Sequence, residues 1–179
     1  PSGTISLLPG EPPGIHYPHS EYYIRRIRVG KHSPLWAAAE RAGYHVEPAV
    51  GQEDSTMVVS FPVKEEFFVR SKDDVSIWEQ VANAVAYQRF WADNQVSITV
   101  TFSEDERDDI KHTLELYEDA LKGISFLPLE EHGYIQAPYE TITEEQYLIM
   151  SHGLTPIDMN SIAEQGVAPK FCDSSSCEL

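Results

Sequence analysis

The amino-acid sequence predicts an α/β fold followed by a flexible tail, because β-branched runs alternate with segments that carry helix-capping signals. Capping boxes, in which Ser or Thr precedes Glu or Gln by three residues, open helical patterns at Ser76, Ser103 and Thr143. Apolar residues make up 41% of the 179 residues, which is enough for one packed domain. The strands are few, so we expect them to belong to a sheet that is shared with sequence outside this chain.

The first half of the chain predicts a loop, a strand, a helix and a second strand. Residues 1–20 are rich in Gly and Pro and predict a loop with a short extended piece. The segment "EYYIRRIRV" that follows fits a short strand or a helical turn. Ser33 and Pro34 form a helix start, and Gly43 is expected to end that helix. The run from Thr56 to Val63 predicts a strand.

The second half predicts alternating helices and strands. After Ser76, "IWEQVANAVAYQRFWADN" predicts an amphipathic helix with Trp78, Val81 and Val85 on one face. The next segment is typical of a strand with one buried face, since every second residue is apolar: Val96, Ile98, Val100 and Phe102.

Ser103 opens a helix to about Lys122, "GISFLPL" predicts a short strand, and Thr143 opens a last helix to about His152. Residues 153–179 have mixed polarity, two Pro and a Ser run, which predicts a mobile tail. The expected division is therefore a folded part over residues 1–152 and a tail over 153–179.

Charge and cysteine content limit which binding partners and which cellular compartment we expect. The chain has 29 acidic and 13 basic residues, and this negative field repels nucleic-acid phosphates, so no nucleic-acid partner is expected. We expect no membrane partner either, because the apolar runs are far shorter than a membrane span. Two cysteines and no secretory leader favour a cytoplasmic protein. The abrupt start inside a loop, without Met, suggests a piece of a larger protein.

The opening "PSGTIS" is a candidate anion-binding segment. Small residues around Gly3 expose several backbone N–H groups at close range, and Ser2, Thr4 and Ser6 add hydroxyl groups. That arrangement suits phosphate. Many turns of this composition bind nothing, and from the residues alone the empty turn is the commoner outcome.

The histidines, an acidic run and three arginines are further candidates. His16 and His19 lie in a loop without Cys nearby, and zinc needs about four convergent ligands, so hydrogen-bonded or solvated histidines are expected. The run "SEDERDD" is expected at a helix N-terminus, where negative charge favours the helix dipole. Arginines of one predicted strand could bind phosphate but are more simply partners for the surplus acid: Arg25, Arg26 and Arg28.

The two cysteines, Cys172 and Cys177, lie in the terminal "KFCDSSSCEL". A disulfide between them would enclose too few residues to stabilise the fold, and a metal site would lack two ligands. An incidental pair and an exposed, exchanging dithiol both remain open. A tail of this length could extend to roughly 85 Å and relax to roughly 28 Å, so its reach is adequate for a shuttle.

Six features occur in one order over nearly the whole chain: "PSGTISLLPG", "YYIRRIR", "FWADNQVSITVTF", "LKGISFLP", "QAPYETIT" and the pair Cys172 and Cys177. Each alone is modest evidence, but their conjunction is specific. In these features the chain resembles the C-terminal part of adenosylcobalamin-dependent (class II) ribonucleotide reductase, most closely the monomeric ribonucleoside-triphosphate reductase type.

The resemblance implies that residues 1–152 are the last portion of a ten-stranded α/β barrel. In that family the opening segment binds the phosphates of the substrate, which implies phosphate contacts for the matching positions Ser2, Gly3, Thr4, Ile5 and Ser6. It also implies that Cys172 and Cys177 form the C-terminal dithiol. In the family this pair reduces a disulfide between two barrel cysteines and is itself re-reduced by thioredoxin.

The function implied for the complete enzyme is reduction of ribonucleotides at the ribose 2′ position by thiyl-radical chemistry, and similarity to the monomeric type favours triphosphates as the substrates. Adenosylcobalamin starts that chemistry, and the radical cysteine, the two barrel cysteines and the effector site lie upstream of Pro1 in the family. The chain alone is therefore expected to be inactive and to need the remainder of the reductase. Two alternatives stay open: a non-catalytic assembly subunit that completes a partner chain's barrel, and a free phosphate-binding module.

Overall fold

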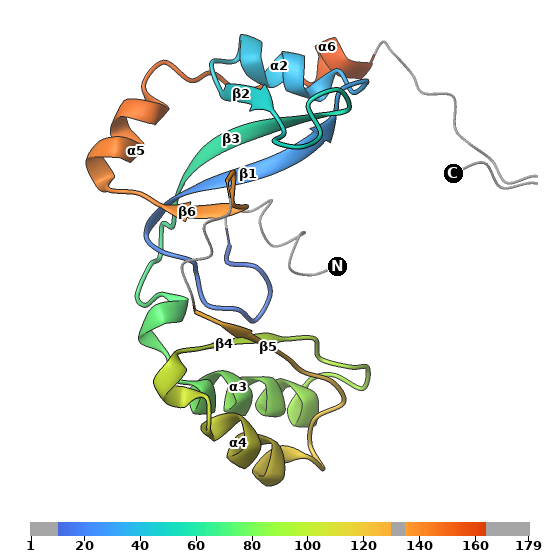
Figure 1. The fold of residues 1–179 in the computed structure, drawn as a ribbon, viewed down its shortest axis with the longest axis vertical. Helices are drawn as coiled ribbons and strands as arrows, with labels where there is room; N and C mark the ends of the chain where they lie inside the picture. Colours follow the sequence, from blue (N-terminus) through green and yellow to red (C-terminus); the bar gives the residue numbers. More distant parts are fainter. Residues whose placement is uncertain (1–10, 130–134, 164–179) are drawn as a thin grey trace, which may run out of the picture.

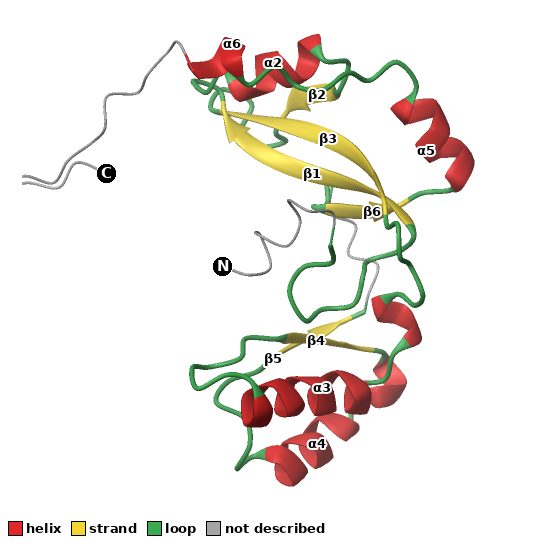
Figure 2. Cartoon of the chain, turned by 180° about the vertical axis from the view of Figure 1, so that it is seen from behind, coloured by secondary structure: helices red, strands yellow, loops and turns green. Residues whose placement is uncertain are grey.

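The computed structural model describes residues 11–129 and 135–163, and over these ranges the chain is a mixed α/β protein with two sheets. Figure 1 shows that each sheet carries its own helices, so the chain divides into two lobes. The antiparallel lobe holds β1, β2, β3 and β6 with α2, α5 and α6, and the parallel lobe holds β4 and β5 with α3 and α4. The loop that precedes β1 lies between the lobes in both ribbon views (Figures 1 and 2).

The antiparallel lobe is built on a four-stranded sheet in the order β2-β3-β1-β6. Its two long strands, β1 (Tyr22–Gly30) and β3 (Thr56–Lys64), pair over their whole length. Strand β3 confirms the strand predicted from Thr56 to Val63, and β1 is a strand where the sequence left a strand or a helical turn open. The two outer strands, β2 (His45–Pro48) and β6 (Tyr139–Thr141), were not predicted. Each is short and has no apolar alternation, so it forms only because a long partner strand supplies the hydrogen bonds.

Helix α2 (Leu35–Arg41) begins one residue later than the sequence predicts. Pro34 takes the N-cap position, and the Ser33 hydroxyl accepts a hydrogen bond from the Leu35 N–H at 3.3 Å. The predicted end at Gly43 is confirmed, since this glycine has a φ of 94° and follows the last helical residues.

Helix α5 (Glu144–Ser151) confirms the capping box predicted at Thr143, because both reciprocal hydrogen bonds with Gln146 are present. The chain then returns to α2. The Thr155 N–H donates to the Ala42 carbonyl at 3.0 Å, and α6 (Asn160–Ala163) follows. The first residues of the segment expected to be a mobile tail are thus held against α2, which the sequence did not indicate; residues 164–179 lie outside the described part.

The parallel lobe is a strand-helix-strand unit that follows a long helix. Helix α3 (Ile77–Phe90) leads to β4 (Thr99–Phe102), and α4 (Asp109–Tyr117) leads to β5 (Ser125–Pro128). Strands β4 and β5 pair in parallel, and α4 supplies the crossover that parallel strands need. The short 3₁₀ turns η1 (Lys72–Asp74) and η2 (Glu104–Glu106) precede α3 and α4. Among the described helices, none is long and apolar enough to cross a membrane.

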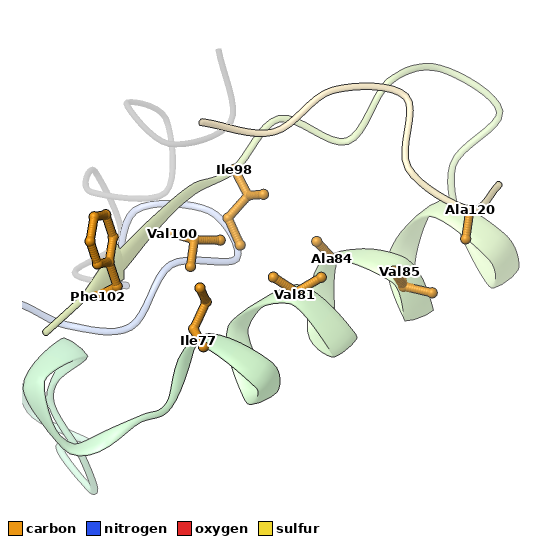
Figure 3. Close-up of a cluster of buried hydrophobic side chains, with 8 residues drawn as sticks. All are labelled: Ile77, Val81, Ala84, Val85, Ile98, Val100, Phe102 and Ala120. Carbon is orange, nitrogen blue, oxygen red and sulfur yellow. The ribbon is translucent and has the colours of Figure 1, made fainter. Parts of the chain in front are cut away.

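The core of the parallel lobe lies between α3 and β4, and Figure 3 shows the side chains that form it. Strand β4 begins later than the sequence predicts, at Thr99. The predicted buried face is confirmed for Ile98, Val100 and Phe102, whereas Val96 is only partly buried. The buried face of α3 lies opposite them and is made of Ile77, Val81, Ala84 and Val85. These apolar faces explain why α3 packs on the sheet.

Both helices of this lobe end earlier than the sequence predicts. Helix α3 stops at Phe90, because the Gln88 side chain donates to the Ala92 and Asn94 carbonyls and accepts from the Val96 N–H at 2.9 Å. These bonds hold the turn that leads to β4. Helix α4 stops at Tyr117, short of the predicted Lys122.

Candidate functional site

The residues that the sequence analysis assigns to phosphate binding and to electron transfer lie outside the described residues: Ser2, Gly3, Thr4, Ile5, Ser6, Cys172 and Cys177. Residues 11–20 are the first described residues that follow this predicted segment, and their contacts are described first.

His16 ties this loop to the edge of β4. Its Nδ1 donates to the Pro13 carbonyl at 2.8 Å, and its Nε2 accepts from the Thr99 N–H at 3.1 Å. Two further bonds hold the loop on either side of the ring. The Lys72 N–H donates to the Pro18 carbonyl at 2.8 Å, and the Asn83 amide donates to the Ile15 carbonyl at 3.4 Å.

A tyrosine, a glutamate and an arginine join the same loop to α3. The Tyr17 hydroxyl donates to Glu79 Oε1 at 2.7 Å, and both guanidinium Nη atoms of Arg70 donate to the two oxygens of that carboxylate. The Arg70 bond, followed by the Tyr17 bond, lowers the pKa of Glu79. Burial, and then the bond to Glu79, raises the pKa of Tyr17. Tyr17 and Glu79 lie 62 positions apart in the sequence, so no local sequence signal could reveal the network.

The Gln80 side chain forms hydrogen bonds to the backbone at the edge of β4, in the way that a neighbouring strand would. Its Oε1 accepts from the Thr101 N–H at 3.0 Å and its Nε2 donates to the Thr101 carbonyl at 2.8 Å. The side chain is buried, with 5% exposed, so an unpaired amide here would be costly. Gln80 and His16 together bind three backbone groups at this edge of β4: the Thr99 N–H, the Thr101 N–H and the Thr101 carbonyl.

A small cavity of about 60 Å³ lies where these groups meet. Its polar lining consists of His16, Tyr17, Lys72, Gln80, Thr99 and Thr101. About two water molecules fill such a volume, whereas a nucleotide or a corrinoid needs several hundred Å³. Over the described ranges, no group of three or more His, Cys, Asp or Glu side chains is placed to hold a metal ion.

An aromatic cluster lies beside this loop. It consists of His19 from the loop, Tyr23 from β1 and Tyr139 from β6. The Tyr139 ring has the Arg25 guanidinium 4.2 Å from its centroid and the His19 ring stacked at 5.4 Å. The Tyr23 hydroxyl donates to the buried carboxylate of Glu65 at 2.8 Å. Burial, and then the charge of Lys72, lowers the pKa of His19. Burial, and then the bond to Glu65, raises the pKa of Tyr23 well above its usual range.

The arginines of β1 bind the segment that contains β6. Arg26 forms an ion pair with Glu140 and donates to the Ala137 carbonyl at 3.1 Å, which confirms the prediction that it pairs with acid. Arg25 donates to the Pro138 carbonyl at 3.3 Å. The Nε atoms of both side chains are buried without a hydrogen-bond partner among the described residues.

Sequence comparison finds relatives that cover the whole chain. A probable adenosylcobalamin-dependent ribonucleoside-triphosphate reductase of Dictyostelium discoideum is 45% identical over 100% of this chain and 24% of its own length. The adenosylcobalamin-dependent ribonucleoside-triphosphate reductase of Euglena gracilis is 44% identical over 99% of this chain and 25% of its own length. That of Lacticaseibacillus paracasei is 40% identical over 82% of this chain.

The fold agrees with these sequences. A crystal structure of a B12-dependent (class II) ribonucleotide reductase matches with a TM-score of 0.75 and 35% identity, over 92% of this chain and 23% of that one. No family model matches the chain. The chain spans about a quarter of the length of the curated relatives named here. Over that quarter, it is homologous in sequence and fold to the adenosylcobalamin-dependent (class II) ribonucleotide reductases.

Proposed function

We propose that this chain is the C-terminal portion of an adenosylcobalamin-dependent ribonucleoside-triphosphate reductase, where it contributes substrate phosphate contacts and a redox-active dithiol. The observation that carries the proposal is agreement over one stretch: 45% sequence identity along the whole chain, and a TM-score of 0.75 to a class II enzyme. The relatives hold this stretch within a polypeptide about four times longer. That favours a portion of an enzyme over a separate assembly subunit.

In the complete enzyme, the parallel lobe would be the last part of a ten-stranded α/β barrel, and the remaining strands would come from the rest of the reductase chain. A two-stranded sheet is too small to be stable alone, and the β4-α4-β5 unit has the parallel connection that such a barrel requires. Adenosylcobalamin would supply the radical that starts the reaction and would bind residues of that remaining part. The enzyme would act in the cytoplasm.

The substrate, a ribonucleoside triphosphate, would place its phosphates on the opening segment. Backbone N–H groups around Gly3 and the hydroxyls of Ser2, Thr4 and Ser6 would donate to phosphate oxygens, and Ile5 would contribute its N–H. A chain of net charge −16 repels triphosphate at long range, so a local array of donors is needed to hold it.

The tail would return electrons to the active site. A thiolate of Cys172 or Cys177 attacks a disulfide between two barrel cysteines, which forms a mixed disulfide and releases one barrel thiol. The second tail thiol then attacks the tail sulfur of the mixed disulfide and releases the other barrel cysteine. The barrel cysteines leave as two thiols while Cys172 and Cys177 become a disulfide. The dithiol of thioredoxin then reduces that disulfide and is itself oxidised.

The proposal is tested by Cys172→Ser and Cys177→Ser in the complete reductase. Each variant is expected to stop sustained turnover with thioredoxin, while prereduced enzyme still makes about one product per active site. Ser174→Ala, between the cysteines, is the matched control and should turn over as the wild type does. Sustained turnover with thioredoxin in either cysteine variant would remove the tail from the electron path.

A further inference from the structure

We propose that β5, and not β4, is the strand at which the parallel sheet gains a further strand from the remainder of the reductase chain. The inference rests on the part of the proposed function that places this chain within a longer reductase. A parallel sheet of two strands is too small to be stable alone, so it needs a further strand on one of its two outer edges. The backbone groups of the two edges differ in what they already bind.

The bonds between the two strands determine which residues face outward. The Ser125 N–H donates to the Ile98 carbonyl at 3.1 Å. The Leu129 N–H donates to the Phe102 carbonyl at 2.8 Å. In a parallel pair, residues that bond to the partner strand alternate with residues whose backbone groups point away from it. Every second residue of each strand therefore faces the partner strand, and the residues between them face outward.

The outer edge of β4 is closed by side chains. Its outward residues are Thr99 and Thr101. The Thr99 N–H donates to His16 at 3.1 Å. The Thr101 N–H and carbonyl bind the Gln80 side chain at 3.0 and 2.8 Å. A strand added on this edge would displace the Gln80 amide, which is only 5% exposed, and an unpaired buried amide costs free energy.

The outer edge of β5 is open over the described residues. Its outward residues are Phe126 and Pro128, and within residues 11–129 and 135–163 the sheet contains only β4 and β5, so no strand there pairs with this edge. The edge offers the Phe126 N–H and carbonyl and the Pro128 carbonyl. Pro128 has no N–H and is the last residue of β5, so an added pairing would end there.

The side chains of β5 are compatible with an added strand. Helices α3 and α4 cover one face of the sheet (Figures 1 and 2), and on that face Phe126 packs edge-on against Phe102 with 6.5 Å between the ring centroids. An added strand would leave this core contact in place. Leu127, on the opposite face, is 48% exposed, which is a liability on an open edge.

A strand of the remaining chain is the occupant that fits this edge. An open edge presents backbone donors and acceptors in a row, and another extended backbone supplies the complementary row. The curated relatives hold this stretch within a polypeptide about four times longer, so about three quarters of such a chain is available to provide the strand.

Hydrogen exchange in the complete reductase tests the edge of β5. The Phe126 amide should exchange about 100-fold or more slowly than an unstructured amide, as expected of an N–H that is bonded within a sheet. The Ser125 amide, which already donates to β4, is the matched control and should be protected as well. Fast exchange of the Phe126 amide would overturn the proposal.

Photo-crosslinking identifies the occupant. The complete reductase carries Leu127→p-benzoylphenylalanine, and its cross-link should map to a segment outside this chain, because neighbouring strands lie about 5 Å apart. The same replacement at Leu116, which is 63% exposed on α4, is the matched control and should not reach that segment. A cross-link from position 127 that stays within these 179 residues, or no cross-link, would overturn the proposal.

The edge of β4 is tested by Gln80→Met in the complete reductase. This variant nearly keeps the side-chain volume and removes both hydrogen-bonding groups, so the Thr101 amide should exchange faster while the Phe126 amide stays protected. An unchanged Thr101 amide would mean that a strand, and not Gln80, covers β4, and it would overturn the proposal.

These measurements do not depend on turnover. If the complete protein reduces no ribonucleotide while the Phe126 amide is protected and the probe at position 127 reaches the remaining chain, the proposed activity fails and the assignment of the edge holds. If the protein reduces ribonucleotides while the Phe126 amide exchanges fast, only the assignment of the edge fails.

Discussion

At the scale of single residues, the loop before β1 is held by bonds between groups far apart in the sequence. Tyr17, Glu79 and Arg70 form one network, and His16 and Gln80 close the exposed side of one strand. None of these roles is visible in the sequence, where Glu79 looks like the third residue of a capping box. Its carboxylate binds Arg70 and Tyr17 instead, since a cation and a hydroxyl satisfy it better than one N–H.

The Glu79 carboxylate gives a prediction about stability and pH. The Arg70 bond lowers the pKa of Glu79 from its ordinary value of 4.5, so the ionised carboxylate stabilises the fold above that value. The contribution disappears as the pH falls through the lowered folded-state pKa. Glu79→Gln should therefore have a smaller free energy of unfolding than the wild type at neutral pH, and the difference should shrink in acid below about pH 4.

Urea unfolding of the 179-residue chain at neutral pH and near pH 3 measures that difference. Asp74 also has a lowered pKa, because it accepts from the Ser71 N–H, so the comparison must be between variants and not within the wild-type curve. Glu66→Gln, at an exposed carboxylate before Arg70, is the matched control. A Glu79→Gln difference that is the same at both pH values would contradict the assigned ion pair.

The buried pair of Tyr23 and Glu65 gives a second residue-scale prediction. Tyr23→Phe removes the hydroxyl at 2.8 Å and leaves a carboxylate that is only 5% exposed without that donor. The expected loss in the free energy of unfolding is about 1–3 kcal/mol. Tyr87→Phe, at a tyrosine that is 41% exposed, should change stability little. Equal effects of the two variants in urea unfolding would argue against the buried bond.

At the scale of elements, apolar alternation and capping signals predicted the helices and the longer strands. The alternation of Ile98, Val100 and Phe102 is a local property, and it was confirmed because burial of one face needs only a helix to cover it. The three capping boxes had different outcomes. That of Thr143 is complete, and that of Ser103 opens a 3₁₀ turn. That of Ser76 lacks its return bond because the Glu79 carboxylate binds Arg70 and Tyr17 instead.

The packing of α3 on β4 predicts which apolar residues stabilise the parallel lobe. Ile77 is fully buried, so Ile77→Ala should lower the free energy of unfolding by about 2–5 kcal/mol through lost burial and a cavity. Leu116→Ala, at a side chain that is 63% exposed, should stay within about 0.5 kcal/mol of the wild type. Similar losses for both variants, measured by urea unfolding, would place the core elsewhere.

At the scale of the whole molecule, the chain exposes large apolar side chains that a complete protein of this size normally covers. Phe90 and Trp91 at the end of α3 are 86% and 84% exposed, and Phe67 before η1 is 81% exposed. Extensive apolar exposure marks a contact surface. Because the relatives are about four times longer, the remainder of the reductase is the expected cover.

Tryptophan quenching tests that expectation. With Trp36→Phe and Trp78→Phe in place, and any tryptophans of the remaining sequence replaced, the fluorescence of Trp91 should be quenched by acrylamide more in the 179-residue chain than in the complete reductase. The exposed ring is accessible to quencher in the short chain and becomes covered in the long one. Equal quenching in both proteins would leave Trp91 outside the interface.

The sequence by itself determined the helices α2, α3, α4 and α5, the strand β3 and the face of β4 that is buried, because these depend on residues within one or two turns of each other. It also carried enough matching segments to identify a resemblance that the comparisons confirm. Only the tertiary structure decided the antiparallel four-stranded sheet, the short strands β2 and β6 and the return of residues 153–163 to α2. The same holds for the bonds of His16 and Gln80, since all these features depend on partners distant in the chain.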